Sequence, residues 1–322
     1  MIRLTSVLLA GALSAFAALP AAAEINRPEC IAPAQPGGGF DLTCRVAQQG
    51  LDGLFDRQVA VSFMPGGIGA VAFNMFNTSR ADDANAIVAF STGSLLNLVT
   101  GKYGDWTVDD ARWLASAGTD YGAVIVRADS PYQTLGDLMA DLKANPGGVT
   151  VGAGGSVGSQ DWMKAALLLK AVDSDPRAMR YVAFDGGGEA LAGLIGGAIQ
   201  VYTGDVAEMS AHMDGSLRVL GVMSEDRLDA PFNEFPTARE QGYDAVWPIM
   251  RGYYVGKNVS DEDYQAWVDI FQKAHGSEQF KKVQAEKGLL PLNLAGADFD
   301  SFVRDQSERL RALAVETGLI AQ

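Results

Sequence analysis

The segment at residues 36–45 constrains the fold more than any other part of this sequence. It reads Pro-Gly-Gly-Gly-Phe-Asp-Leu-Thr-Cys-Arg, follows an apolar run at residues 30–34, and precedes apolar residues at helical spacing. We therefore expect a strand, a glycine loop and a helix, with Asp41 at the N-cap or in the first turn. Such a loop presents free backbone N–H groups at the positive end of a helix, where a carboxylate or phosphate can bind. Without a side chain, Gly38 can take a positive φ and lie against such a ligand. A glycine-rich turn that binds nothing is the plainer alternative.

Strand-like and helical segments alternate along the rest of the chain. Residues 86–90, Ala-Ile-Val-Ala-Phe, form a continuous apolar run that is typical of a strand buried on both faces. Two successive series of strand, loop and helix indicate parallel sheets, and the chain is long for one domain. We therefore expect an α/β fold of two lobes, each a mostly parallel sheet flanked by helices. The expected strands are residues 30–34, 58–63, 86–90, 112–117, 122–127, 149–151, 179–183, 199–202 and 217–222.

The N-terminus has the features of a secretory signal peptide. Arg3 supplies the positive region, residues 8–19 the apolar region, and three alanines at residues 21–23 a cleavage site before Glu24. The apolar part is too short for a stable membrane span, and no later stretch reaches ~18 apolar residues. We therefore expect cleavage after Ala23 and a soluble protein in the periplasm.

The charge and the cysteine count limit the partners of this chain. A formal charge of −14 argues against nucleic acid or an anionic membrane as a partner, and an anionic ligand must be held by local groups against this mean field. Two histidines and two cysteines without ligand spacing do not make a zinc site, and we expect no metal and no cofactor. Cys30 and Cys44 are either joined in a disulfide, which an oxidising compartment favours, or reduced and buried. The sequence leaves both states open.

Several motifs, in this order and spacing, resemble the substrate-binding proteins of tripartite tricarboxylate transporters, the Bug or TctC-type family. The likeness covers nearly all of the chain after the signal peptide. Two positions depart from the family pattern: Asp185 stands where most members have Lys, and Met250 replaces the Trp of a Trp-Arg-Gly motif. The matching segments are the first glycine loop at residues 36–41, a Ser-Pro to Pro-Gly block at residues 130–147, the loop at residues 154–159, and residues 184–186, 218–223, 235–242 and 251–252.

The resemblance implies a type II-like, two-lobed periplasmic-binding-protein fold with the ligand cleft between the lobes. Lobe 1 would comprise residues 24–122 and 249–322, and lobe 2 residues 123–248. The implied function is capture of a small carboxylate, a citrate-like tricarboxylate or a dicarboxylate, and its delivery to the membrane subunits of the transporter. We expect a monomer. An enzyme is not expected.

Loops at the carboxyl ends of the strands supply the candidate site, because ligands bind there in open parallel sheets. The loops at residues 37–41 and 155–159 come from different lobes, and the resemblance implies that they hold the two ends of the ligand through backbone N–H groups, hydroxyls and waters. Each Ser or Thr can equally cap its own helix. The candidate ligand-binding residues are Gly37, Gly38, Gly39, Phe40, Asp41, Ser91, Thr92, Gly155, Ser156, Val157, Gly158, Ser159, Asp185, Thr203, Gly204, Asp205 and Arg251.

The charges of two of these residues decide whether they can contact an anionic ligand. Asp185 is unfavourable next to an anionic ligand, so it must point away, meet a cation, or contact a hydroxyl of the ligand. Arg251 can form a bidentate contact with a carboxylate. In so acidic a chain, a hinge salt bridge from Arg251 to an acidic residue is the favoured alternative.

One rival interpretation is an exported serine hydrolase. Residues 154–158 fit G-x-S-x-G between a strand and a helix, with Ser156 as the nucleophile, and both His212 and His275 follow it in the chain. The glycine-rich loop has an adequate use without chemistry, His275 lies in a polar helical stretch, and His212 precedes a turn at residues 213–215. We therefore favour the binding protein.

Overall fold

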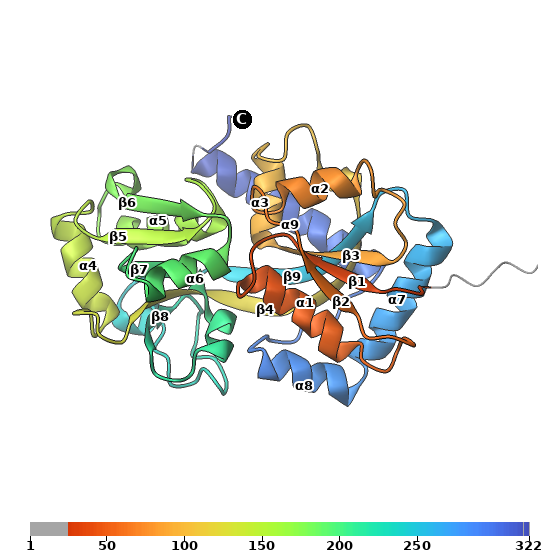
Figure 1. Ribbon diagram of the computed structural model, residues 1–322. Helices are drawn as coiled ribbons and strands as arrows, with labels where there is room; N and C mark the ends of the chain where they lie inside the picture. Colours follow the sequence, from red (N-terminus) through yellow and green to blue (C-terminus); the bar gives the residue numbers. More distant parts are fainter. Residues whose placement is uncertain (1–24, 318, 322) are drawn as a thin grey trace, which may run out of the picture.

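The computed structural model describes residues 25–317 and 319–321, so the predicted signal peptide and its cleavage after Ala23 lie outside the described residues. Two α/β halves are joined by two long antiparallel strands, β4 (Ala111–Arg127) and β9 (Pro248–Gly256), as Figure 1 shows. No helix of this described part is long and apolar enough to cross a membrane.

The first half is built on parallel strands that β9 extends in the antiparallel sense. β1 pairs with β2 on one side and β3 on the other, and β3 pairs with β9. All six residues of β3 are buried, as the apolar run predicts, because helices cover both faces of this sheet. Its strands are β1 (Glu29–Ala32), β2 (Ala60–Phe63) and β3 (Ala86–Ser91), and its helices are α1 (Gly39–Gly50), α2 (Ala70–Phe76), α3 (Thr92–Val99), α7 (Asp261–His275), α8 (Glu278–Glu286) and α9 (Ala297–Glu316).

The second half repeats the arrangement. β5 lies between β6 and β7 and is parallel to both, while β7 and β8 pair antiparallel with the end of β4. Its strands are β5 (Thr150–Gly154), β6 (Arg180–Phe184), β7 (Val201–Asp205) and β8 (Leu217–Val222), and its helices are α4 (Leu135–Ala144), α5 (Gln160–Lys170) and α6 (Gly187–Ile195). The short 3-10 helix η3 (Val206–Ala211) follows β7 directly.

The prediction of separate strands at residues 112–117 and 122–127 is wrong, because one continuous strand, β4, spans both. Residues 111–121 pair with β9, and residues 122–127 pair with β7 and β8. The register shift between Ser116 and Gly118 is an irregularity within the ladder and does not end the strand. Gly118 has φ +146°, and a glycine at such a position bends a strand without ending it. The two halves therefore share a continuous strand, and the lobe boundaries proposed from the sequence remain a prediction.

A disulfide joins Cys30 in β1 to Cys44 in α1, with Cα atoms 5.5 Å apart. Both residues are fully buried. The bond ties the strand before the first glycine loop to the helix after it, so it fixes the position of that loop.

Candidate ligand site

A cavity lies between the two halves at the amino-terminal ends of four helices. Its volume is about 40 Å³, room for a few water molecules and far below the ~300 Å³ of ordinary ligand pockets. This is therefore a closed arrangement, and the halves must separate to admit a small-molecule ligand. The cavity is lined by Gly39, Phe40, Ile68, Ser91, Gly93 and Asn97 from the first half, Gly154, Ser159, Gln160, Asp161, Gly186, Gly187, Asp205 and Glu208 from the second, and Arg251 of β9.

The helices that begin at the cavity differ in how their first N–H groups are satisfied. Ser91 caps α3 by accepting a hydrogen bond from Gly93, and Ser159 caps α5 by accepting one from the Trp162 N–H. By contrast, α1 and α6 begin after Gly38 and Gly186 without a side-chain cap. The first-turn N–H groups of α1 and α6 are thus free to bind an acceptor such as a carboxylate, at the positive ends of two helix dipoles.

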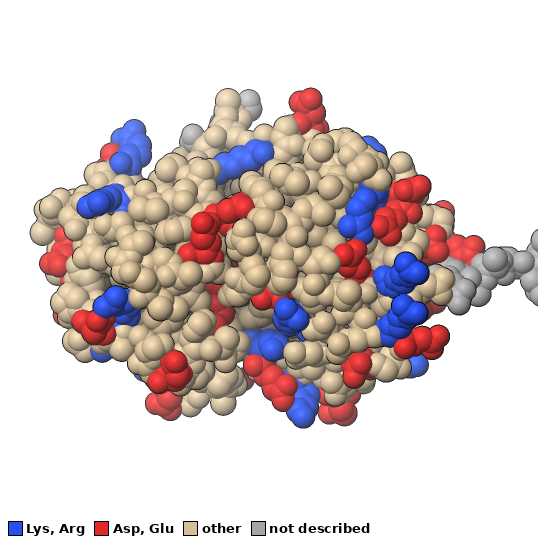
Figure 2. Space-filling model, in the orientation of Figure 1, with Lys and Arg blue, Asp and Glu red and all other residues tan. Residues whose placement is uncertain are grey.

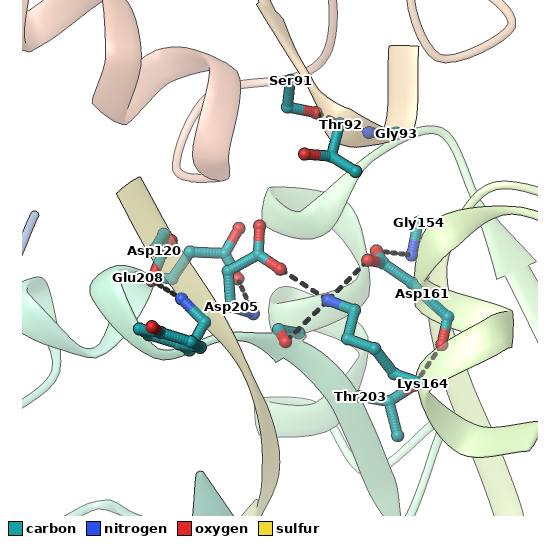
Figure 3. A network of polar contacts seen from close by, with 12 residues as sticks. Ser91, Thr92, Gly93, Asp120, Gly154, Asp161, Lys164, Thr203, Asp205 and Glu208 are labelled. Atoms are coloured by element: carbon teal, nitrogen blue, oxygen red, sulfur yellow. Dashed lines mark hydrogen bonds and ion pairs between the residues drawn. The ribbon is translucent and has the colours of Figure 1, made fainter. Parts of the chain in front are cut away.

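A chain of buried ion pairs forms one side of the cavity, and Figure 3 shows the part of it at Asp161, Lys164 and Asp205. Arg251 Nη2 lies 2.6 Å from Asp120 Oδ2 and 2.5 Å from Asp205 Oδ2. Lys164 Nζ lies 2.5 Å from the other oxygen of Asp205 and 2.7 Å from Asp161 Oδ1. The chain runs from the crossing strands β4 and β9 to β7 and α5, so it connects the hinge region to the second half.

Glu208 adds a fourth carboxyl group to this cluster, against two cations. Tyr202 donates a hydrogen bond of 2.5 Å to Glu208 Oε2. Burial, followed by the charge of Asp205, raises the pKa of Glu208 to about 8. Burial also raises the pKa of Asp161 to about 6, although Lys164 acts in the opposite direction.

The two cations stay charged despite their burial. Burial opposes the charge on Arg251 and Lys164, but their carboxylate partners outweigh it and raise both pKa values. Lys164 and Arg251 likewise outweigh the burial of Asp205 and lower its pKa. With Arg251 only 1% exposed and bound to two carboxylates, the hinge salt bridge expected from the sequence is the arrangement present.

Six of the residues predicted from the sequence line the cavity. Gly39 lies directly under the guanidinium of Arg251, since a Cβ on Gly39 would come within 2.2 Å of Arg251 Nη1. The six residues are Gly39, Phe40, Ser91, Ser159, Asp205 and Arg251.

The remaining residues of the first loop have other partners. The expectation of a positive φ at Gly38 is wrong: its φ is −100°, and Gly37 has the positive value, +92°. Gly38 instead approaches the second half so closely that a Cβ would lie 2.5 Å from Gly188 N. Asp41 accepts a hydrogen bond from Gly37 N–H and pairs with Arg45, so it stabilises its own loop.

The polar residues at the other strand ends mostly support the framework. Thr92 Oγ1 accepts a hydrogen bond from the Met250 N–H, and Thr203 Oγ1 donates one to the Asp161 carbonyl. The Gly204 carbonyl accepts a hydrogen bond from Lys164. None of Thr92, Thr203 and Gly204 lines the cavity.

The loop at residues 155–158 lies at the rim of the cleft, outside the cavity lining. Ser156 is exposed and Val157 is 60% exposed. The Gly155 carbonyl accepts a hydrogen bond from Tyr181, and Gly158 lies beside Leu319. Asp185 accepts a hydrogen bond of 3.2 Å from the Ile68 N–H in the opposite half, so it contacts the first half at the edge of the cleft.

The sequence analysis missed several residues that line the cavity, where it had expected the loop at residues 155–158. Gly186 and Gly187 open α6 with the same strand–glycine–helix signature as the first loop, and that signal was available. Asp161 and Lys164 are three residues apart in α5, a spacing that normally indicates an exposed helical pair. Their burial follows from Asp205 on β7, a contact that the sequence does not show.

Among the described residues, no hydrogen bond joins Ser156 of the G-x-S-x-G motif to either His212 or His275. Buried His275 lies in the first half, with Nε2 3.0 Å from the Ser116 carbonyl oxygen, whereas Ser156 lies in the second half. Within the described ranges, no group of three or more His, Cys, Asp or Glu residues is placed to hold a metal ion.

Two α/β halves that share crossing strands and enclose a cavity at helix N-termini define a solute-binding protein of the periplasmic type. The chain belongs to the TctC family, the tripartite tricarboxylate transporter family receptors, whose pattern matches residues 43–319. Members of this family are binding proteins and not enzymes, which removes the hydrolase alternative.

Individual relatives agree with this assignment. The protein BugT of Bordetella pertussis is 25% identical, with 99% of this chain and 98% of BugT aligned. MatC of Rhodopseudomonas palustris, solved with bound malate, superposes with a TM-score of 0.77 at 16% identity over 89% of this chain and 98% of MatC. A second R. palustris protein, solved with adipate, has a TM-score of 0.78 at 17% identity over 91% of this chain and 97% of its own. These likenesses confirm the two-lobed α/β fold expected from the sequence.

Proposed function

We propose that this protein captures a small di- or tricarboxylate between its two lobes and delivers it to the membrane subunits of a tripartite tricarboxylate transporter. It would do so in the periplasm, as a monomer, after cleavage following Ala23. The observation that carries the proposal is the pair of uncapped helix N-termini, α1 and α6, which meet at the cavity from opposite lobes. The malate and adipate bound by two proteins of the same fold are both dicarboxylates, which supports this ligand class.

Attraction for an anion comes from inside the cleft. On the face drawn in Figure 2, acidic side chains lie where the two halves meet, and the whole chain has a formal charge of −14. Backbone N–H groups and helix dipoles act over a few ångströms, so they can bind a carboxylate where the surface potential repels it.

Capture follows from the contacts that join the lobes across the cleft. In the closed arrangement Ile68 N–H donates to Asp185, and Lys102 Nζ donates to the Val157 carbonyl at 3.1 Å. These two hydrogen bonds are separate from the hinge, where β4 and β9 provide a continuous connection. A ligand that touches both lobes binds the closed form better than the open form, and this difference shifts the population towards closure.

Calorimetry against a panel of di- and tricarboxylates tests the proposal, together with small-angle scattering to follow compaction. We expect one panel member to bind in the micromolar range, about −8 kcal/mol, and to reduce the radius of gyration. Native mass spectrometry of protein purified from its host should show a retained carboxylic acid. A protein that binds no carboxylate, and carries none from its host, would contradict the proposal.

A further inference from the structure

Hydrogen-bond acceptors that can take a further donor gather in the ligand cavity. Among the described residues, six buried side-chain nitrogen or oxygen atoms lack a hydrogen-bond partner, and three of them belong to residues that line this cavity. These three are Asn97 Oδ1, Gln160 Oε1 and Asp161 Oδ1. Each unsatisfied acceptor in a buried site costs free energy until a donor reaches it.

The three acceptors come from both lobes. Asn97 lies on α3 and is only 4% exposed. Gln160 and Asp161 open α5, and Gln160 reaches across the cleft, since a Cβ on Gly93 would lie 2.9 Å from Gln160 Cδ. In Figure 3, the carboxylate of Asp161 lies on the side of the cavity away from Ser91 and Gly93. A donor bound here would therefore contact both lobes.

Asp161 fixes the polarity of this part of the cavity. Rotating an amide exchanges its oxygen for its nitrogen, but an ionised carboxylate is an acceptor in every orientation. The Gly154 N–H already satisfies Asp161 Oδ2. Asp161 Oδ1 is paired with Lys164 Nζ at 2.7 Å. A carboxylate oxygen has two lone pairs, so Asp161 Oδ1 can accept a second donor beside Lys164.

The charge around the cavity favours a cationic donor. Three carboxyl groups, those of Asp120, Asp161 and Asp205, face the two cations Arg251 and Lys164, and a fourth, that of Glu208, keeps its proton up to a pKa of about 8. A ligand with carboxylates alone satisfies the N–H groups of α1 and α6 but leaves this excess of carboxyl groups without a counter-charge. An ammonium substituent supplies up to three donors and a positive charge, and a hydroxyl supplies one donor.

We propose that the ligand carries an ammonium or hydroxyl substituent beside its carboxylates, and that Asp161, Asn97 and Gln160 accept hydrogen bonds from it. This inference rests on the proposed capture of a carboxylate and specifies which carboxylates are bound. Unsubstituted dicarboxylates would offer these three acceptors no donor, so they would bind more weakly than their substituted analogues of equal length.

Matched probes test the inference by calorimetry. Succinate, malate and aspartate differ only in the substituent, as do glutarate, 2-hydroxyglutarate and glutamate, and tricarballylate differs from citrate by one hydroxyl. On the skeleton that binds best, we expect the substituted acid to bind about tenfold or more tightly than the unsubstituted one. Whether the amino or the hydroxy acid binds more tightly identifies the donor.

Variants locate the acceptors. Asn97→Leu removes one acceptor and should reduce the preference for the substituted acid about three- to tenfold, with little effect on the unsubstituted acid. Asp161→Asn keeps the shape but removes the charge, and should reduce a preference for an ammonium group more than a preference for a hydroxyl. Asn77→Leu is the control, because Asn77 also has an unpartnered buried oxygen but lies at the end of α2, outside the cavity lining. It should leave the preference unchanged.

The outcomes separate the inference from the proposed function. If unsubstituted and substituted acids bind equally well, the inference fails while the carboxylate-binding function stands. If no acid of the panel binds, both fail. A clear preference that persists in both Asn97→Leu and Asp161→Asn would overturn the assignment to these acceptors. Retained affinity for the unsubstituted acid in each variant shows that the variant is folded.

Discussion

The backbones of Gly38 and Gly188 lie against each other across the cleft. A Cβ on Gly38 would come within 2.5 Å of Gly188 N, and one on Gly188 within 2.1 Å of the Pro36 carbonyl oxygen. Gly38 precedes α1 and Gly188 lies in the first turn of α6. The two uncapped helix N-termini can approach to this distance only because neither residue has a side chain.

Replacing Gly38 by Ala should therefore block complete closure without damaging the first lobe. Its φ of −100° is open to any residue, so the variant should fold. We expect carboxylate affinity to fall at least about tenfold, which is about 1.4 kcal/mol, and ligand-induced compaction to decrease in scattering. Gly38→Val should have a larger effect.

Gly276→Ala is the matched control for this prediction. Gly276 also has an ordinary φ, −76°, and its Cβ would meet nothing closer than 3.6 Å. If Gly38→Ala binds and compacts like the wild type, closeness at Gly38 does not limit closure, and the first glycine loop is not part of the site.

Removing the buried cation Arg251 should destabilise the fold strongly. Arg251→Met keeps an unbranched side chain but leaves Asp120 and Asp205 buried without their shared partner. Breaking such a pair from one side costs about 3–5 kcal/mol, measurable as a lower urea midpoint.

Arg177→Met is the control, because it removes an arginine from an exposed ion pair instead of a buried one. Arg177 pairs with Asp175 at the surface and its side chain is 85% exposed, so the change should be within about 1 kcal/mol. Equal effects of the two substitutions would show that the buried network adds nothing to stability.

Local patterns in the sequence predicted most helices and strands, but not which of their loops meet in the folded protein. The run at residues 86–90 and the loop at residues 36–41 specify a buried strand and a helix start through local chemistry alone. In the second lobe, residues 154–159 and 184–188 carry similar glycine signatures. Which residues of each loop line the cavity depends on the sheet order β7-β5-β6, a long-range property. The sequence prediction emphasised residues 155–159, of which Ser159 lines the cavity, and it missed residues 186 and 187.

The charged residues of the site were hidden for a similar reason. Asp161 and Lys164 look like a solvated pair on α5, and Glu208 like an exposed residue of a turn. Their burial depends on Asp205 and Arg251, which lie far along the chain on β7 and β9. A buried charge requires partners in three dimensions, and those partners cannot be read from spacing.

Reduction of the disulfide between Cys30 and Cys44 should cost about 2–4 kcal/mol, because the bond closes a short loop of the unfolded chain; the two cysteines are 14 residues apart. The Cys30→Ala, Cys44→Ala double variant should show the same loss in urea unfolding and weaker ligand binding, since the first glycine loop lies between the two positions. Alkylation has to follow denaturation, because both cysteines are fully buried and would not react in the folded protein in either redox state. Two alkylatable thiols in denatured, unreduced periplasmic material would rule the bond out.

Glu208 should make the protein less stable as the pH rises from 7 to 8.5. Burial raises its pKa in the folded chain to about 8, from an ordinary value of 4.5, so the folded chain binds this proton more tightly than the unfolded chain. When the pKa of a carboxyl group is raised on folding, the free energy of unfolding decreases as the pH rises from the unfolded pKa to the folded pKa. For Glu208, about 1 kcal/mol of this decrease falls between pH 7 and 8.5. Asp161, with a pKa of about 6, and His275, whose pKa is lowered from 6.5 by burial, titrate below this window.

Urea unfolding at pH 7.0, 7.75 and 8.5 measures this loss, and Glu208→Gln should abolish it, because a glutamine still accepts the hydrogen bond from Tyr202 and has no proton to lose in this range. Glu278→Gln is the control: Glu278 pairs with Lys281 at the surface, and the pKa of its carboxyl is lowered, so it is ionised in both states throughout and its replacement should leave the slope unchanged. The same slope in wild type and Glu208→Gln would mean that the proton is held elsewhere.

If the slope does disappear, carboxylate affinity should be measured over the same pH range. Loss of the Glu208 proton adds a negative charge to the cavity wall, so the wild type should bind its ligand more weakly at pH 8.5 than at pH 7, and Glu208→Gln should bind it equally at both.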